Sequence, residues 1–98
     1  MQAENPKLTV EEFYDIPGDT RAELIHGILY DMAPSPSTIH QEISGELFVT
    51  IHSFISRNKG QCKVFSASYD VQLSDDTIVI PDISVICDKS KITSKRCV

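Results

Sequence analysis

Three residues of this sequence combine a reactive side chain with an informative position: Asp82, His40 and Glu42. Asp82 follows Pro81 within the apolar run of residues 77–87, where an unpaired buried carboxylate is strongly destabilising. Because proline lacks a backbone donor, Pro81-Asp82 indicates a point where a strand opens and presents an acid. Two interpretations are open: a ligand for a hard divalent cation, or a carboxylate hydrogen-bonded to nearby backbone at a bulge.

His40 and Glu42 lie near the start of a long helix predicted to end at about Arg57. At about 100° per residue, His40 falls in the middle of the apolar stripe of that helix, whereas Glu42 points away. His40 is therefore a candidate ligand, proton carrier or phosphate binder, or else a hydrogen-bonded residue at the core edge. Glu42 has the chemistry of a metal ligand but an unfavourable position on the helix. The stripe, which must pack on a sheet or another helix, consists of Ile39, Ile43, Leu47, Ile51, Phe54 and Ile55.

Capping signals predict where the helices begin. Thr9 is a favourable N-cap and Glu12 completes a capping box, so a short helix starts here and ends by Pro17. The long helix is capped by Thr38 or Ser35, and residues 58–60 close it.

Two apolar runs, residues 22–25 and 28–32, flank the dipeptide His26-Gly27. This pattern is typical of a tight β-hairpin, in which Gly27 supplies a positive φ. Glu23 and His26 flank the turn and are expected to be solvated.

Two further strands are predicted after the long helix. Residues 62–73 alternate between apolar and polar positions, which indicates one half-covered strand. Residues 74–76 form a turn, and residues 77–87 are apolar on both faces, as a central strand is. Asp70 lies on the polar face of the first strand, either near Asp82 or simply in solvent. The element order places the chain in the α+β class, with α/β-like features.

Composition limits the alternatives. The 98 residues suffice for one small domain, and 14 acidic against nine basic residues give a net charge of −5, the opposite of most nucleic-acid binders. Four basic residues fall in the last ten positions. They form either an exposed tail or loop, or a phosphate contact. No apolar run could span a membrane and no signal peptide is recognisable, so a cytoplasmic location is expected. The three cysteines are expected to be reduced thiols, with Cys87 in the core.

Four segments, in order, resemble one family. Residues 23–30 (ELIHGILY) resemble its opening hairpin, residues 40–44 (HQEIS) the start of its main helix, residues 69–74 (YDVQLS) its first core strand and residues 81–85 (PDISV) its signature strand. By these segments the sequence is identified as a member of the "putative restriction endonuclease" branch of the PD-(D/E)XK nuclease-like superfamily.

This resemblance implies a restriction-endonuclease-like core and a function in DNA cleavage. Asp82 would be the aspartate of the Pro-Asp motif and a ligand for catalytic Mg²⁺, or for Mn²⁺ in its place. In the superfamily a glutamate on the first helix often assists. Glu42 is the candidate by position and His40 by helix face, so both stay as catalytic candidates beside Asp82.

The sequence departs from the family pattern because it stops at Val98, before the strand that carries the (D/E)-x-K element. The isolated chain is therefore not expected to be active. We expect residues 1–98 to be the N-terminal part of a longer nuclease-like domain, with a helix and connector over 1–21 and a partial core over 22–98. The alternative is a natural remnant that pairs with itself or another chain.

An exposed edge or face of the strand at residues 77–87 would favour association, so a homo-oligomer is expected. The competing function is a non-catalytic interaction module on the same scaffold.

Overall fold

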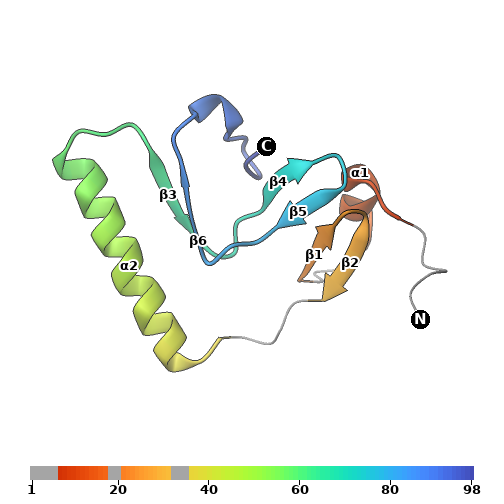
Figure 1. Cartoon of the computed structure of the whole chain (residues 1–98), viewed down its shortest axis with the longest axis horizontal. Helices are drawn as coiled ribbons and strands as arrows, with labels where there is room; N and C mark the ends of the chain where they lie inside the picture. Colours follow the sequence, from red (N-terminus) through yellow and green to blue (C-terminus); the bar gives the residue numbers. More distant parts are fainter. Residues whose placement is uncertain (1–6, 18–20, 32–35) are drawn as a thin grey trace.

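The computed structural model describes residues 7–17, 21–31 and 36–98. The chain has an α+β fold with antiparallel strand pairs, as predicted (Figure 1). Its elements are α1 (Val10–Tyr14), β1 (Ala22–Ile25), β2 (Ile28–Asp31), α2 (Thr38–Arg57), β3 (Lys63–Ser66), β4 (Val71–Ser74), β5 (Thr77–Val79), β6 (Ile83–Ile86) and the 3₁₀ turn η1 (Lys89–Lys91).

The local signals before α2 give the predicted elements. Thr9 and Glu12 form the complete capping box of α1, which is shorter than predicted and ends at Tyr14. The β1–β2 hairpin turns at His26 and Gly27, whose φ angles are 51° and 81°. Two positive φ values identify a turn whose twist matches that of the flanking strands. The connector at residues 32–35 lies outside the described residues.

The two long strands of the prediction are each divided in two. β3 and β6 pair with one another in a two-stranded sheet, whereas β4 and β5 join the hairpin in a sheet of order β2-β1-β5-β4. The predicted continuous strands at residues 62–73 and 77–87 are therefore wrong, although their halves do pair in antiparallel fashion. The second break falls at Pro81, where a strand lacks a ladder donor.

The N-cap of α2 is Ser37, whose hydroxyl accepts a hydrogen bond from the backbone N–H of His40 at 3.1 Å. Thr38, one of the two predicted caps, is instead the first helical residue, and Ser35 lies outside the described residues. α2 runs alongside β3 and ends at Arg57 as predicted (Figure 1).

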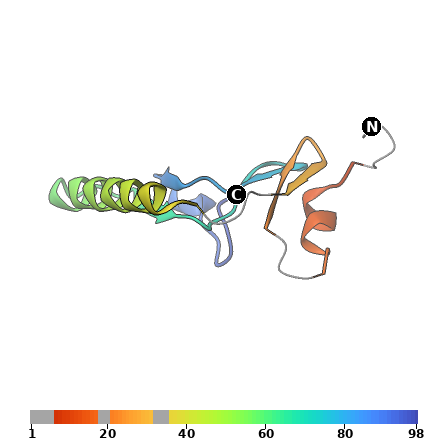
Figure 2. The ribbon, with the colours of Figure 1, turned by 90° about the horizontal axis from the view of Figure 1, so that it is seen from below.

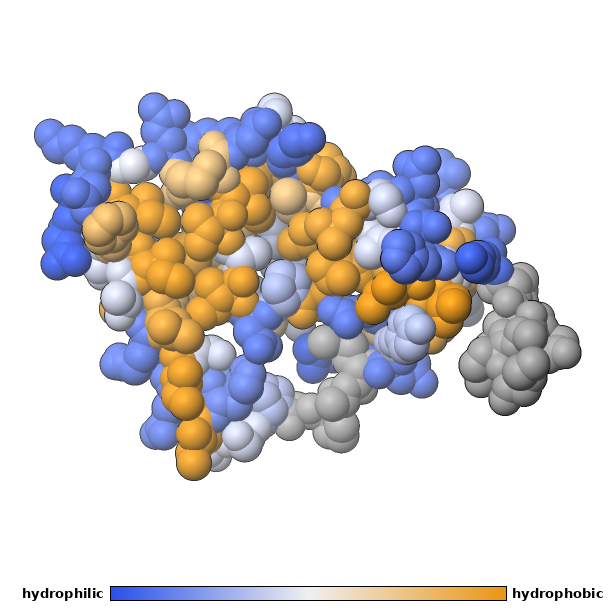
Figure 3. Space-filling model, viewed as in Figure 1, coloured by the Kyte–Doolittle hydropathy of each residue, from blue (hydrophilic) through white to orange (hydrophobic). Residues whose placement is uncertain are grey.

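The prediction that the whole apolar stripe of α2 is covered is wrong. Ile51 and Ile55 are half-buried, but the other stripe residues are exposed. Their exposed fractions are 67% for Ile39, 56% for Ile43, 50% for Leu47 and 61% for Phe54. Figure 3 shows a continuous hydrophobic surface over α2 and the adjacent strands on the face shown.

The buried core lies at the opposite end of the molecule from α2. Val10, Leu24 and Ile78 form it, with Leu8 and Phe13 packed against them. α1 and the hairpin are thus fixed to β5 at one end of the molecule, and α2 lies at the other end (Figure 2). α2 contributes no fully buried residue. The chain is accordingly elongated, with extents of 51 × 34 × 21 Å. Within the described ranges, no helix has the length and apolar character needed to cross a membrane.

The cysteines differ from the prediction of reduced thiols. Cys62 and Cys87 form a disulfide that lies next to the paired residues Lys63 and Ile86, and Cys87 is exposed rather than part of the core. Cys97 is a buried free thiol. The disulfide links the start of β3 to the end of β6.

The C-terminal segment is partly docked rather than a free tail. Cys97 exchanges backbone hydrogen bonds with Asp70 and Gln72 beside β4. Arg96 is half-buried, with its guanidinium 4.5 Å from the centre of the Tyr14 ring. The exposed-tail prediction therefore holds for the lysines of this segment and is wrong for Arg96.

Candidate functional site

Asp82 lies in the break between β5 and β6, directly before Ile83. Its side chain is 65% exposed, in agreement with the prediction that the strand opens here and presents an acid. The reason is the strand break itself, because Pro81 ends the ladder and the carboxylate leaves the apolar surroundings. The Asp82 carbonyl still accepts a hydrogen bond from the backbone N–H of Ala67 at 3.0 Å, which fixes the acid beside the end of β3.

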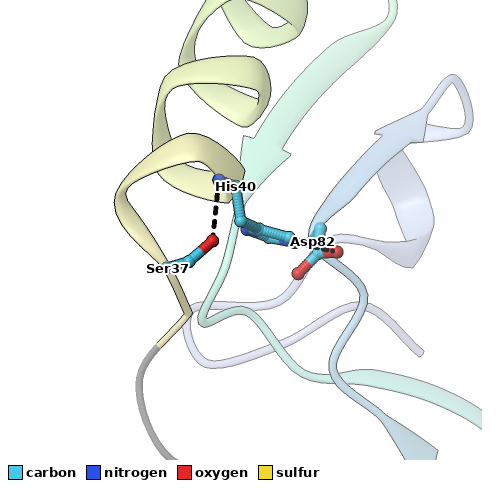
Figure 4. Close-up of polar contacts among 3 residues, drawn as sticks. All are labelled: Ser37, His40 and Asp82. Atoms are coloured by element: carbon cyan, nitrogen blue, oxygen red, sulfur yellow. Dashed lines mark hydrogen bonds and ion pairs between the residues drawn. The ribbon is translucent and has the colours of Figure 1, made fainter.

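His40 comes from the first turn of α2 and contacts Asp82 across 42 sequence positions (Figure 4). Its Nε2 lies 3.0 Å from Oδ2 of Asp82, and this is the one ion-pair contact within the described ranges. An ionised carboxylate only accepts hydrogen bonds, so Nε2 carries the donated proton. His40 Nδ1 is buried and has no hydrogen-bond partner among the described residues.

Ser37 positions His40 by fixing the start of the helix. The Ser37 hydroxyl binds the backbone N–H of His40, and the ring of the same His40 contacts Asp82 (Figure 4). The helical-wheel argument placed His40 on the face of α2 that turns toward the strands, and the structure brings His40 and Asp82 together.

Glu42 does not join this pair. It is exposed and lines a shallow depression on α2 together with Glu46 and Thr50. The two apolar residues of that depression are Ile43 and Leu47. Glu42 therefore lies beside Ile43 and Leu47, two residues of the apolar stripe, and its catalytic role stays a prediction.

Glu23 was predicted to be solvated, and that prediction is wrong. The side chain is half-buried in β1, and its Oε2 accepts a hydrogen bond of 2.8 Å from the backbone N–H of Ile80. Ile80 directly precedes Pro81, so Glu23 fixes the segment that leads to Asp82. The alternation within β1 gives no indication of this contact, because the partner lies 57 positions away.

Asp70 binds a different partner from Asp82. It accepts a hydrogen bond of 2.5 Å from the hydroxyl of Tyr14, in α1. Burial and this contact with Asp70 raise the pKa of Tyr14, so the phenol keeps its proton at neutral pH. Asp70 therefore links α1 to the residue directly before β4, and it contacts Tyr14 rather than Asp82.

The donor set around Asp82 is small. In the described part of the chain, no three His, Cys, Asp or Glu side chains form a group that could hold a metal ion. One exposed carboxylate suits the coordination of Mg²⁺, which is commonly bound through one or two carboxylates together with water and substrate phosphates. Asp82 thus fits as one ligand of such an ion.

An α+β chain that presents a Pro-Asp carboxylate at a strand break fits the nuclease-like class that the resemblance implied. The family model described as "Putative restriction endonuclease" matches residues 10–97. The chain therefore belongs to this family, and the family assignment made from the sequence is confirmed. No curated protein matches the chain.

Proposed function

We propose that this chain is part of a Mg²⁺-dependent DNA endonuclease in which Asp82 is a metal ligand. Family membership supports the nuclease class. The observation that carries the proposal for this residue is the exposed Asp82 carboxylate held against His40 at 3.0 Å. In the same proposal residues 22–98 are part of a nuclease-like core.

His40 is proposed to orient the acid. Its Nε2–H donates to Oδ2 of Asp82, which leaves the other carboxylate oxygen for a ligand. A divalent ion bound there would polarise a phosphodiester and lower the pKa of a bound water. Glu42 has no part in this proposal, because it lines the depression on α2 and makes no hydrogen bond or ion pair with Asp82 among the described residues.

Metal binding is testable without activity. A ligand that binds only the folded state stabilises it by RT ln(1 + [L]/Kd), or about 1.4 kcal/mol at roughly ten times Kd. For a domain of this size, each kcal/mol raises Tm by roughly 4–8 °C. We expect MgCl₂ or MnCl₂ to raise the Tm of the wild-type chain, as followed by circular dichroism, and Asp82→Asn to remove that increase.

The matched control is Asp75→Asn, which changes an exposed carboxylate in the β4–β5 turn. It should keep the full metal response. An equal response in the Asp82 and Asp75 variants would show that the ion binds elsewhere and would contradict the proposal.

A non-catalytic interaction module is the second candidate, and the exposed apolar residues of α2 favour it. A surface patch of this kind usually marks an association site. Under this candidate the chain associates through α2, which is a face other than the predicted strand edge.

Sedimentation velocity separates this candidate from a purely monomeric chain. Self-association that Leu47→Glu abolishes, while Arg21→Glu at an exposed position outside α2 leaves it unchanged, would support it. A wild-type chain that stays monomeric at high micromolar concentration would exclude homo-oligomerisation through α2.

A further inference from the structure

The charges of this chain are strongly segregated along the sequence. Residues 47–69 and 83–98 contain seven of the nine basic residues and one of the 14 acidic residues. These two segments therefore carry a formal charge of +6, whereas the rest of the chain carries −11. The net charge of −5 hides this separation.

The fold brings cations from both segments to one end of the molecule. β3 pairs with β6 so that Lys63 lies opposite Ile86, and the Cys62–Cys87 disulfide joins the strands there. α2 ends at the same edge of the molecule, where residues 58–62 connect it to β3, and η1 begins three positions after the last residue of β6 (Figure 1). The cations at this end, which we call the basic rim, are Arg57, Lys59, Lys63, Lys89 and Lys91.

All five side chains of the basic rim are exposed. None of them forms an ion pair within the described part of the chain, where the His40–Asp82 contact is the only one. Asp88 is the one acid close to the rim in sequence, and it accepts hydrogen bonds from the backbone N–H and the hydroxyl of Ser90. These bonds hold the pKa of Asp88 below its usual value, so one negative charge stays beside five positive ones.

We infer that the basic rim is a docking surface for the phosphate backbone of duplex DNA. Its cations come from the ends of three elements and do not converge on a pocket, which suits an extended polyanion better than a small anion. Lysine and arginine on such a surface release counterions from DNA and position the duplex without reading its sequence.

This inference rests on the proposed nuclease function for the identity of the polyanion. The rim and the His40–Asp82 pair lie at opposite ends of α2, since His40 is in its first turn and Arg57 is its last residue. At about 1.5 Å per residue the two are roughly 26 Å apart along the helix axis. Each strand of a duplex carries one phosphate per about 3.4 Å. A duplex that lies along α2 would therefore extend over about eight base pairs between the rim and the site.

The experiment measures binding of a fluorescent 20-base-pair duplex (a length of about 68 Å) by anisotropy, in EDTA and over a range of salt concentrations. Two double variants neutralise the rim, Lys59→Gln/Lys63→Gln and Lys89→Gln/Lys91→Gln. The matched control is Lys7→Gln/Arg21→Gln, which removes two exposed cations at the other end of the molecule. Lys→Arg versions of both rim variants keep the charge.

Each rim variant should weaken binding and reduce the slope of log K against log salt by about 1 for each lysine. The control and the arginine versions should bind as the wild type does. Equal binding by rim variants and control, or no salt-dependent duplex binding at all, would overturn the inference. Rim-dependent binding to phosphatidylserine vesicles without duplex binding would also overturn it.

Asp82→Asn separates the two proposals. Because the rim contacts phosphates directly, this variant should bind the duplex in EDTA as the wild type does. Rim-dependent duplex binding that persists in Asp82→Asn would therefore support the docking surface independently of the result for the catalytic proposal.

Discussion

At the residue scale, the candidate site consists of one acid and the groups that fix it in place. His40 contacts the Asp82 carboxylate, and Ala67 binds its backbone carbonyl. Glu23 fixes the chain two residues earlier through the N–H of Ile80. The sequence identified His40 and Asp82, because each conflicts with an otherwise apolar pattern. It did not identify Glu23, whose role depends on a strand pairing that no local pattern encodes.

Removing the Glu23 carboxylate should destabilise the segment before Asp82. Glu23→Ala leaves the N–H of Ile80 without its acceptor, and an unsatisfied partly buried donor costs about 1–3 kcal/mol. Glu23→Gln keeps an acceptor oxygen and should cost less. Urea unfolding followed by circular dichroism measures both, and wild-type stability of the alanine variant would contradict this role.

At the element scale, local signals predicted what depends on neighbours in sequence. The capping box of α1, the hairpin turn and the end of α2 all follow from a few adjacent residues. The division of the long strands was missed, because apolar alternation continues through residues 67–70 although β3 and β4 belong to different sheets. Pro81 indicated the second break. Nothing in the local pattern indicated that the two halves of that strand, β5 and β6, pair with different partners.

The hairpin turn should depend on glycine at position 27. Gly27 has φ of +81°, and an added Cβ would lie 2.8 Å from the Lys7 Cβ and 3.1 Å from the Leu8 carbonyl oxygen. Gly27→Ala should therefore lower the free energy of unfolding by at least about 1 kcal/mol. Gly45→Ala is the matched control: nothing lies within 4 Å of its new Cβ, so it should raise helix stability by about 0.5–1 kcal/mol. Equal effects of the two changes would contradict the turn assignment.

The β3–β6 pair should depend on its disulfide. Closing the loop between Cys62 and Cys87, which are 25 positions apart, should stabilise the fold by about 3 kcal/mol. We expect a reducing agent to lower the urea midpoint of the wild type and to leave that of Cys62→Ser/Cys87→Ser unchanged. An unchanged wild-type midpoint, with thiol titration confirming reduction, would show that the bond does not support the fold.

At the scale of the whole molecule, one elongated chain combines a compact core with two distinct surfaces. The compact core fixes α1 and the hairpin, and the other half carries exposed apolar residues on α2 and cations at the basic rim. In Figure 3 the left and upper edges are hydrophilic, while the middle of the same face is hydrophobic. The net charge of −5 counts against a DNA-binding protein, but a net charge does not report how charges are distributed in space.

The measurement that tests the central claim most directly is Mn²⁺ titration of the ¹⁵N-labelled chain, followed by paramagnetic broadening of its amide resonances. If Asp82 is a metal ligand, broadening should begin at the amides of Asp82, Ile83 and Ala67, and Asp82→Asn should remove it. Broadening centred on the Asp75-Asp76 turn, or the same broadening in the Asp82 variant, would contradict the assignment of Asp82 as the metal ligand.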